Sequence, residues 1–399
     1  ADARLNPGRG RLRLRTLVLE GDPGRVRGDL TAVRSGEHPW QIGAQLDIDR
    51  LDLRALAQRL GVTLDTADAE ALTELAGRVE LGADPGGINL ARLDLRVDGA
   101  HWQGTARIAM PAAPEIRFAL QADRLDLDRY LPARASGDGA PARSPADWLR
   151  RLAGLDLDGT LDLAALTGRG LAVQRGVLVL RTGNGQIALK PLRAHLYGGT
   201  AEANVDVVAR AGDPTLRVSL SVRDVAAEAV LEATTGRAPL HGRLSAAGEL
   251  TGVAAGGDAL LRSLRGTLQA TVHDGALRGI AIERQLCLAQ TAGKPCDRSP
   301  DARFSALRAS GAVNRGVWRS GDVRLDLLPA PSGRPERLTG TGTLDLPTGA
   351  IDSRLRTAGA GAGTPLSVRV RGVPGDYSVR AERPAGKAPP PALRRRQSP

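Results

Sequence analysis

Apolar and polar residues alternate over short runs along most of the chain, most clearly between Leu155 and Leu286. The segments 201–207 and 216–223 place Ala, Val or Leu at every second position, with Glu, Asn, Asp, Ser or Arg between them. A period of two puts successive side chains on opposite faces of a β-strand. Because Gly, Asp and Asn turns separate the runs, the pattern predicts a long antiparallel sheet with one apolar and one solvated face.

The same alternation predicts strands near both ends of the chain, at 11–19, at 42–49, between 78 and 120, and again from Arg303. Roughly twenty strands at about 4.8 Å each would extend on the order of 100 Å, and such a sheet must twist. We therefore expect a mainly β fold: a long twisted antiparallel sheet that curls around its apolar face, with a few short helices. Whether this face forms the core of a sandwich or an elongated apolar groove is decided by the resemblance given below, which favours the groove. Helical spacing is found at 51–60, 66–76, 148–152, 225–233, 259–264 and 280–288.

The composition of residues 133–147 predicts a flexible loop or linker, because they are rich in Ala, Gly, Ser and Pro. This loop divides the chain into an upstream β-groove segment, 1–132, and a second β-groove region, 148–383. Residues 384–399 are basic and Pro-rich, and we expect them to be disordered.

The net charge of +11 lies mainly towards the two ends, because residues 36–301 together carry −3. A nucleic-acid-binding protein would be expected to interleave aromatic residues with its cations. The chain has nine aromatic residues in 399, and its Arg residues alternate with Leu and Val as on a solvated sheet face. We therefore expect no nucleic-acid partner. The basic ends could meet anionic lipid surfaces, at about 1 kcal/mol per cation, or simply keep a large sheet soluble.

The two cysteines, Cys287 and Cys296, are separated by eight residues. Their even number and the Gly-Lys-Pro loop between them favour a disulfide, while two unrelated buried thiols are the alternative. A disulfide would require an oxidising compartment. A zinc site is not expected, since no third or fourth ligand lies nearby.

Candidate chemistry is sparse. The five histidines are scattered, and none forms a metal-spaced pair. Asp156, Asp158 and Asp162 share one strand face, where they could bind Ca²⁺ or form the solvent side of the sheet. The Gly-rich stretch 359–363 precedes no helix that could hold a phosphate. We expect no cofactor, no metal and no enzymatic activity.

Six segments in order resemble the C-terminal region of the AsmA family. They are LDLDRYLP at 125–132, LDLDGTLDL at 155–163, LKPLRAHLYGGTAEANVDV at 189–207, LRSLRGTLQATVHDGALRGIAI at 261–282, FSALRASGAVNRGV at 304–317 and GTGTLDLPTGAIDSRLR at 340–356. The resemblance implies a bacterial envelope protein related to bridge-like lipid-transfer proteins: a long β-groove in the periplasm, anchored in the inner membrane by an N-terminal helix. The sequence has no such helix and does not begin with Met, so we expect it to be a fragment.

The family also implies a role in outer-membrane homeostasis and phospholipid movement. Phospholipid acyl chains, the membrane and envelope proteins are then the expected partners. A structural scaffold that assists outer-membrane protein assembly without carrying lipid is the alternative, and a lipid hydrolase would need a clustered site that the sequence lacks. Nine apolar residues on the strands are candidates for a lining that faces lipid. Alternatively, they form the core of an ordinary β-sandwich. Those candidates are Ile187, Leu189, Val205, Val207, Leu216, Val218, Leu220, Leu268 and Val272.

Overall fold

The computed structural model describes residues 2–6, 10–34, 39–59, 61, 64, 66–110, 115–130, 145–168, 170–210, 212–254, 258–290, 296, 299–328, 336–357 and 365–382. These residues form six short helices and twenty-four strands. The helices are α1 (Leu53–Arg59), α2 (Leu127–Tyr130), α3 (Pro145–Ala153), α4 (Ala227–Thr235), α5 (Asp258–Ser263) and α6 (Ile282–Gln290).

The strands of the first third are β1 (Asp2–Asn6), β2 (Arg11–Gly21), β3 (Gly24–Val33), β4 (Gln41–Leu51), β5 (Leu75–Asp84), β6 (Gly87–Val97), β7 (Ala100–Ala109), β8 (Glu115–Ala122) and β9 (Leu125–Asp126). Those of the middle are β10 (Asp156–Leu163), β11 (Leu166–Gly168), β12 (Leu171–Val173), β13 (Arg175–Gly183), β14 (Gln186–Leu196), β15 (Gly199–Val208), β16 (Thr215–Ala226), β17 (Leu240–Val253) and β18 (Arg265–Leu277). The last are β19 (Ala302–Asn314), β20 (Val317–Leu327), β21 (Arg337–Asp345), β22 (Ile351–Thr357), β23 (Ser367–Val373) and β24 (Asp376–Glu382).

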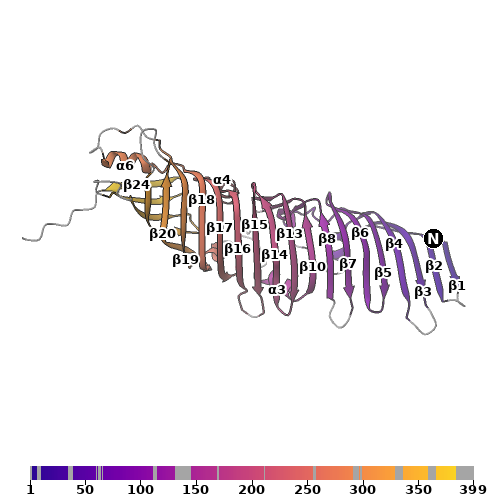
Figure 1. Cartoon of the computed structure of the whole chain (residues 1–399). Helices are drawn as coiled ribbons and strands as arrows, with labels where there is room; N and C mark the ends of the chain where they lie inside the picture. The colour runs from indigo at the N-terminus through magenta and orange to yellow at the C-terminus, as the bar shows by residue number, and fades with distance from the viewer. Residues whose placement is uncertain are drawn as a thin grey trace, which may run out of the picture.

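Twenty-one of these strands form one sheet. Hydrogen-bonded neighbours follow chain order from β1 to β8, then β10, then β13 to β24. Figure 1 shows β1 and β24 at opposite ends of an elongated molecule. At about 4.8 Å per strand, the sheet extends on the order of 100 Å. The predicted mainly β fold with a long curled sheet is confirmed.

The sheet is antiparallel except at one point, where β8 and β10 run parallel. A parallel neighbour requires the chain to return to the end at which the first strand began. Residues 123–155 make that return and contain β9, α2 and α3. The linker predicted at 133–147 falls within this crossover. Its last three residues begin α3, and the others lie outside the described residues. The sheet itself is continuous from the upstream to the downstream segment.

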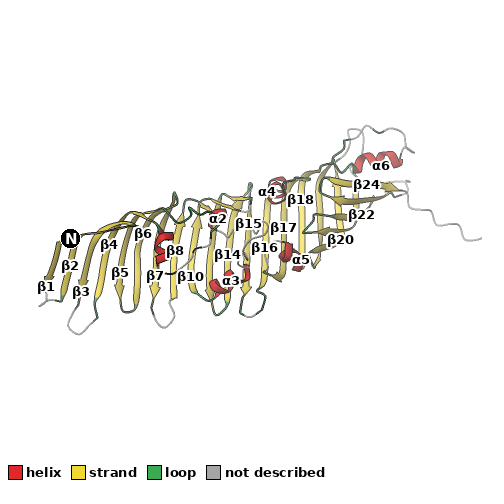
Figure 2. Cartoon of the chain, turned by 180° about the vertical axis from the view of Figure 1, so that it is seen from behind, coloured by secondary structure: helices red, strands yellow, loops and turns green. Residues whose placement is uncertain are grey.

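The short helices lie on one side of the sheet. Figure 2 shows α2, α3, α4 and α5 in front of the strands when the molecule is viewed from behind. Helix α3 contacts β13 and β14, whereas α4 and α5 contact β17. A separate three-stranded sheet, β9, β11 and β12, joins this side through contacts of β12 with β14 and with α4.

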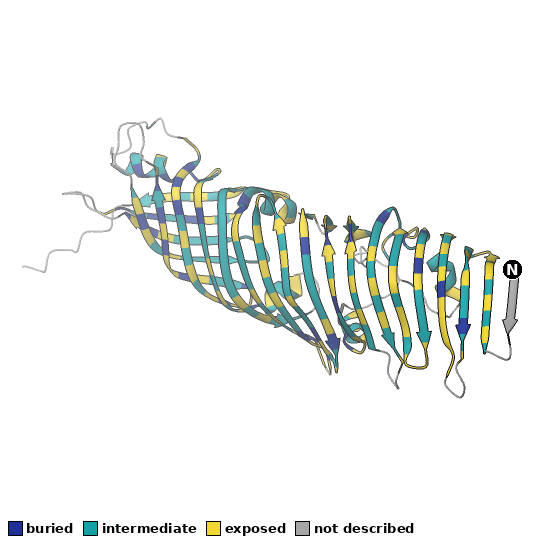
Figure 3. Cartoon of the chain, turned by 45° about the vertical axis from the view of Figure 1, so that its right-hand side comes forward, coloured by how far each residue is buried: buried dark blue, intermediate teal, exposed yellow. Residues whose placement is uncertain are grey.

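The C-terminal strands turn across the rest of the sheet and enclose a core (Figure 3). Arg237, in the loop before β17, donates a hydrogen bond to the carbonyl oxygen of Pro374, in the β23–β24 turn. This contact joins two strand connections 137 residues apart. The enclosed core, called here the sealed core, consists of Val272, Ile280, Ile282, Leu286, Ala302, Phe304, Val323, Leu325, Leu327, Leu338, Leu355, Leu366, Val368 and Val370.

The structure corrects two local predictions. The helical piece expected at 66–76 is wrong: residues 66–74 form turns and irregular backbone, and β5 begins at Leu75. The guanidinium of Arg54 donates to the carbonyl oxygens of Leu64, Asp68 and Ala71 at 3.2 Å, and these tertiary contacts hold the loop. In addition, the alternation predicts two short strands at 267–272 and 276–278, whereas the structure forms one strand there, β18.

The apolar face as the candidate functional site

Cross-strand register brings the apolar positions of successive strands into rows. Leu30 of β3 stands opposite both Leu14 and Ala44, and Val205 of β15 stands opposite both Leu189 and Val218. Directly paired side chains lie on the same face of a sheet. One such row runs through thirteen strands: Leu14, Leu30, Ala44, Leu81, Leu90, Ala106, Phe118, Gly159, Leu180, Leu189, Val205, Val218 and Leu250. The face that carries it is called here the apolar face.

The row continues without interruption across the parallel pair β8–β10. Phe118 stands opposite Gly159, whose missing side chain makes room for the ring: a Cβ there would lie 2.6 Å from the ring carbons. The next pair along the same face is Leu120 and Leu161. The crossover therefore changes the strand direction but preserves which residues face the apolar side.

Most of the apolar face from β2 to β16 is only partly covered. In the row of thirteen, Ala44 and Gly159 are buried, and the other eleven residues are half-buried. At the ends of the same face, Leu19 and Ile88 are exposed by 57% and 37%. The sealed core differs, since Phe304, Leu338 and Val368 are 0% exposed. The apolar face is thus partly open over β2–β16 and closed at the C-terminal end.

The structure places the nine predicted lining residues in three environments. Ile187, Val205, Val207 and Leu216 lie beneath α3, in a cluster with Ala153. Val272 belongs to the sealed core. The remaining four, which are half-buried, belong to neither cluster: Leu189, Val218, Leu220 and Leu268. All nine lie on the apolar face, because the register pairs them with one another or with residues of that face.

An upstream β-groove segment was predicted at 1–132, but all nine predicted lining residues lie downstream of β10. Leu46, Val79 and Leu93 form a second row upstream of β10, each opposite the next, and none was among the predicted lining residues. The signal was present, because residues 42–48 and 93–97 show the same alternation as the middle of the chain. The register of the long sheet was needed to join these short runs into one surface.

The opposite face, called here the polar face, carries exposed ion pairs between neighbouring strands. Arg78 pairs with Asp47 at 2.8 Å, and Arg193 pairs with Glu202 at 3.2 Å. Exposed pairs of this kind contribute about 0–1 kcal/mol each. Asp158, one of the three aspartates considered for Ca²⁺, instead lies 3.3 Å from Arg181.

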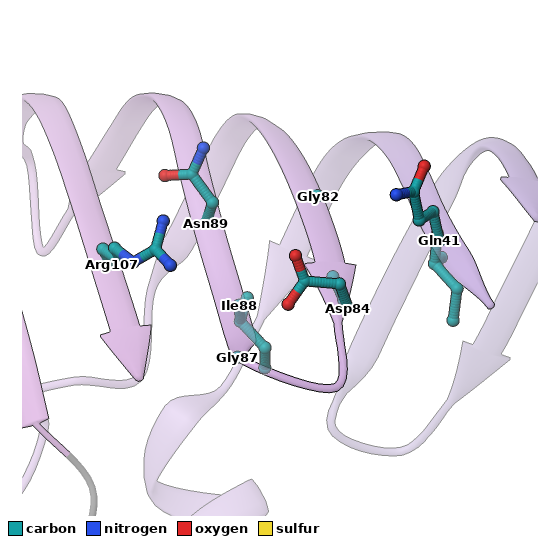
Figure 4. A pocket seen from close by; sticks show the side chains of 9 residues that line it. Gln41, Gly82, Asp84, Gly87, Ile88, Asn89 and Arg107 are labelled. Atoms are coloured by element: carbon teal, nitrogen blue, oxygen red, sulfur yellow. The ribbon is translucent and has the colours of Figure 1, made fainter. Parts of the chain in front are cut away.

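A shallow hollow near the ends of β4 to β7 is lined by polar side chains together with Ile42 and Ile88. Figure 4 shows Gln41, Asp84, Asn89 and Arg107 projecting on one side of the ribbons. A neighbouring hollow is lined by Arg107, Arg117, Asp158 and Arg181, among others. In the second hollow, Asp158 and Arg181 pair across neighbouring strands.

The two cysteines and Tyr130 do not line either of these hollows. Cys287 and Cys296 form a disulfide with a Cα–Cα distance of 6.2 Å, as predicted. Within the described part of the chain, no three His, Cys, Asp or Glu side chains are grouped to hold a metal ion. Burial and the hydrogen bond to the Asp98 carboxylate raise the pKa of Tyr130 to about 12. This tyrosine sits at the end of α2, away from the open rows.

The fold and its surface define an extended β-sheet protein with one continuous, partly open apolar face. Residues 139–323 match the model of the AsmA family, the family that the resemblance predicted. The family is associated with the bacterial envelope and with lipid-related functions. Comparison with curated proteins and with solved structures gave no match. Among the described residues, no helix has the length and apolarity needed to cross a bilayer.

Proposed function

We propose that this protein handles lipid in the bacterial periplasm, with phospholipid acyl chains lying against the apolar face. The observation that carries the proposal is the row of thirteen residues from Leu14 to Leu250, eleven of which are only half-buried. Soluble monomers rarely expose contiguous apolar patches larger than a few hundred Å². An acyl chain is a suitable cover, because burying each CH₂ contributes about 0.8 kcal/mol.

The chemistry of the face supports a hydrocarbon ligand over a polar one. Its rows consist mainly of Leu, Val, Ala, Ile and Gly, with Phe118 among them, while the charged residues of the same strands lie on the polar face. Aliphatic side chains offer no directional contacts, so the face could accommodate acyl chains that differ in length. We also infer that the protein is not an enzyme, since the carboxylates of the polar face are largely engaged with arginines of neighbouring strands.

The test is native mass spectrometry with lipid extraction on the purified chain. Val205 and Val218 stand opposite each other on the apolar face, Val205 at the edge of the cluster beneath α3 and Val218 outside it. In Val205→Asp/Val218→Asp, two carboxylates face the proposed acyl chains, and we expect co-purifying phospholipid to fall by at least tenfold. The matched control is Asn204→Asp/Ser219→Asp, the adjacent opposite pair on the polar face. It should retain lipid. Circular dichroism must show that both variants fold.

A structural scaffold without lipid is the second candidate, and the sealed core favours it. There the sheet closes on its own side chains, as a protein built for rigidity would do. If wild-type protein is lipid-free and the methyl signals of Leu189 and Val218 are as rigid and dispersed as those of Leu338, the face is closed on itself. The scaffold function would then replace lipid handling.

A further inference from the structure

The positive charge of the chain is concentrated at its C-terminal end. Residues 302–399 contain seventeen Arg and Lys against seven Asp and Glu, in a chain whose net charge is +11. Strands β19 to β24 lie in this region, and six of the seventeen cations, at position 334 and within 383–396, lie outside the described residues. Charge of one sign gathered at one end of an elongated molecule produces a directional field that a charged partner can sense.

On the polar face of β22, β23 and β24, three arginines stand in a line. Arg354 is directly opposite Arg369, which is directly opposite Arg380. Side chains in direct register are about 5 Å apart at Cβ, and like charges at this spacing destabilise the pairing. Arg193 of β14 instead faces Glu202 of β15. Arg107 and Arg117 of β7 and β8 also stand opposite each other, but as a pair and not as a row of three.

Two carboxylates partly compensate this arginine row: Asp352, which pairs with it directly, and Glu382, which lies near Arg369. Asp352 accepts a hydrogen bond from Arg369 at 2.7 Å and lies 3.9 Å from Arg371. Hydrogen bonding by Arg369, together with the nearby positive charges, holds the pKa of Asp352 below its usual range, so it stays ionised. Arg354, Arg356 and Arg380 are exposed. The row therefore keeps exposed arginines in addition to those that pair with a carboxylate.

We propose that the polar face of β22–β24 docks on anionic lipid headgroups at a bilayer surface. A bilayer supplies what this face requires: many negative charges spread over a plane, which reduce the repulsion between neighbouring arginines. A nucleic acid fits less well, because the aromatic residue of these strands, Tyr377, packs against the sealed core and is not available for stacking on bases. The C-terminal end would then rest on a membrane by its charge, whatever the apolar face binds.

The test is co-sedimentation of the full chain with two sets of vesicles, phosphatidylcholine alone and phosphatidylcholine mixed with phosphatidylglycerol. We expect preferential binding to the anionic vesicles, weakening as salt is raised. In Arg354→Gln/Arg356→Gln/Arg380→Gln, affinity should fall by roughly fivefold per arginine, on the order of 100-fold in all. Arg369 is kept because it pairs with Asp352.

The matched control is Arg92→Gln/Arg96→Gln/Arg107→Gln, which removes the same charge from exposed positions on β6 and β7. It should bind anionic vesicles within about threefold of wild type, since its charges lie far from the docking face. The thermal midpoint of the β22–β24 variant should be unchanged or higher, because repulsion is relieved. Equal binding to both vesicle types, or equal losses in the two variants, would overturn the proposal. If the arginine row instead binds an acidic protein, the chain should bind equally to the two types of vesicle.

Discussion

At the residue scale, the hydrogen bonds of Asp98 link α2 to the main sheet. Its carboxylate accepts from the amide of Leu72 and from the hydroxyl of Tyr130, both at 2.8 Å. Burial, followed by the Asp98 hydrogen bond, raises the pKa of Tyr130 from 10.0 to about 12. The folded state therefore binds this proton more tightly than the unfolded state does. The resulting stability is present below pH 10 and is lost as the pH rises towards 12.

Replacing Tyr130 by Phe should therefore reduce the loss of stability between pH 10 and 12. Urea unfolding at a series of alkaline pH values measures this as the change in unfolding free energy with pH. Tyr197→Phe is the control, because the Tyr197 hydroxyl accepts from the amide of Ala172 and is not bonded to a carboxylate in the described structure. Equal alkaline slopes for wild type and Tyr130→Phe would show that the Asp98 contact does not govern the titration.

The open and the closed parts of the apolar face each contain one phenylalanine, so the two parts can be compared by mutation. Phe304 is 0% exposed in the sealed core, whereas Phe118 is half-buried over Gly159. Phe304→Ala should cost about 3–5 kcal/mol of unfolding free energy, since it leaves an enclosed cavity. Phe118→Ala should cost less than half as much, because water or ligand can fill the space. Guanidinium denaturation of both variants tests this, and equal costs would mean that the face around Phe118 is also closed.

At the element scale, α6 is the helix joined by the disulfide to the segment that follows it. Cys287 lies on α6, and Ile282 and Leu286 of the same helix are buried in the sealed core. In the chain-entropy model, a loop of this length contributes about 2–3 kcal/mol. Cys287→Ser/Cys296→Ser should lower the unfolding free energy by that amount. Reductant should produce the same loss in wild type and none in the variant. A loss in the variant on adding reductant would point to another cause.

The elements themselves were largely predictable because period two and helical spacing are local signals. The spacing at 259–264 and 280–288 corresponds to α5 and α6 within two residues at each end. Two failures have physical causes. The turns at 66–74 are held by Arg54, a contact from a different element that no local pattern reveals. Strand β3 was not recognised because Gly28 interrupts its apolar side, where a Cβ would meet the Gln45 carbonyl oxygen at 2.2 Å.

At the scale of the whole molecule, the sequence predicted which side chains share a face but not where that face is closed. Val218 and Val272 occupy equivalent places in the alternation, yet the first is half-buried and the second belongs to the sealed core. Closure results from twist accumulated over many strands and from β-bulges, such as those between Phe304 and Ala306 and between Ser320 and Val323. Small rotations at each strand pair add up, so closure depends on the complete set of registers.

The division into an open and a sealed part predicts where along the molecule lipid can be captured. A photo-crosslinking phenylalanine analogue at positions of the open apolar face should capture phospholipid, whereas adjacent polar-face positions should not. At Tyr377 the analogue replaces a ring of similar size packed against the sealed core, where we expect no capture. Protein isolated from cells and analysed by mass spectrometry provides the readout. The open positions are Leu90, Leu161 and Leu220, and their polar-face controls are Arg92, Asp162 and Ser221.

The profile along the sheet is more informative than any single crosslink. Lipid lying along a continuous face should be captured at Leu90, Leu161 and Leu220 alike, because the parallel pair β8–β10 does not interrupt the row. If lipid is captured only downstream of this pair, the apolar face consists of separate segments and the crossover is a barrier between them. Capture at Tyr377 as strong as at Leu220 would contradict the sealed end, because an acyl chain could then pass between β24 and the strands it packs against.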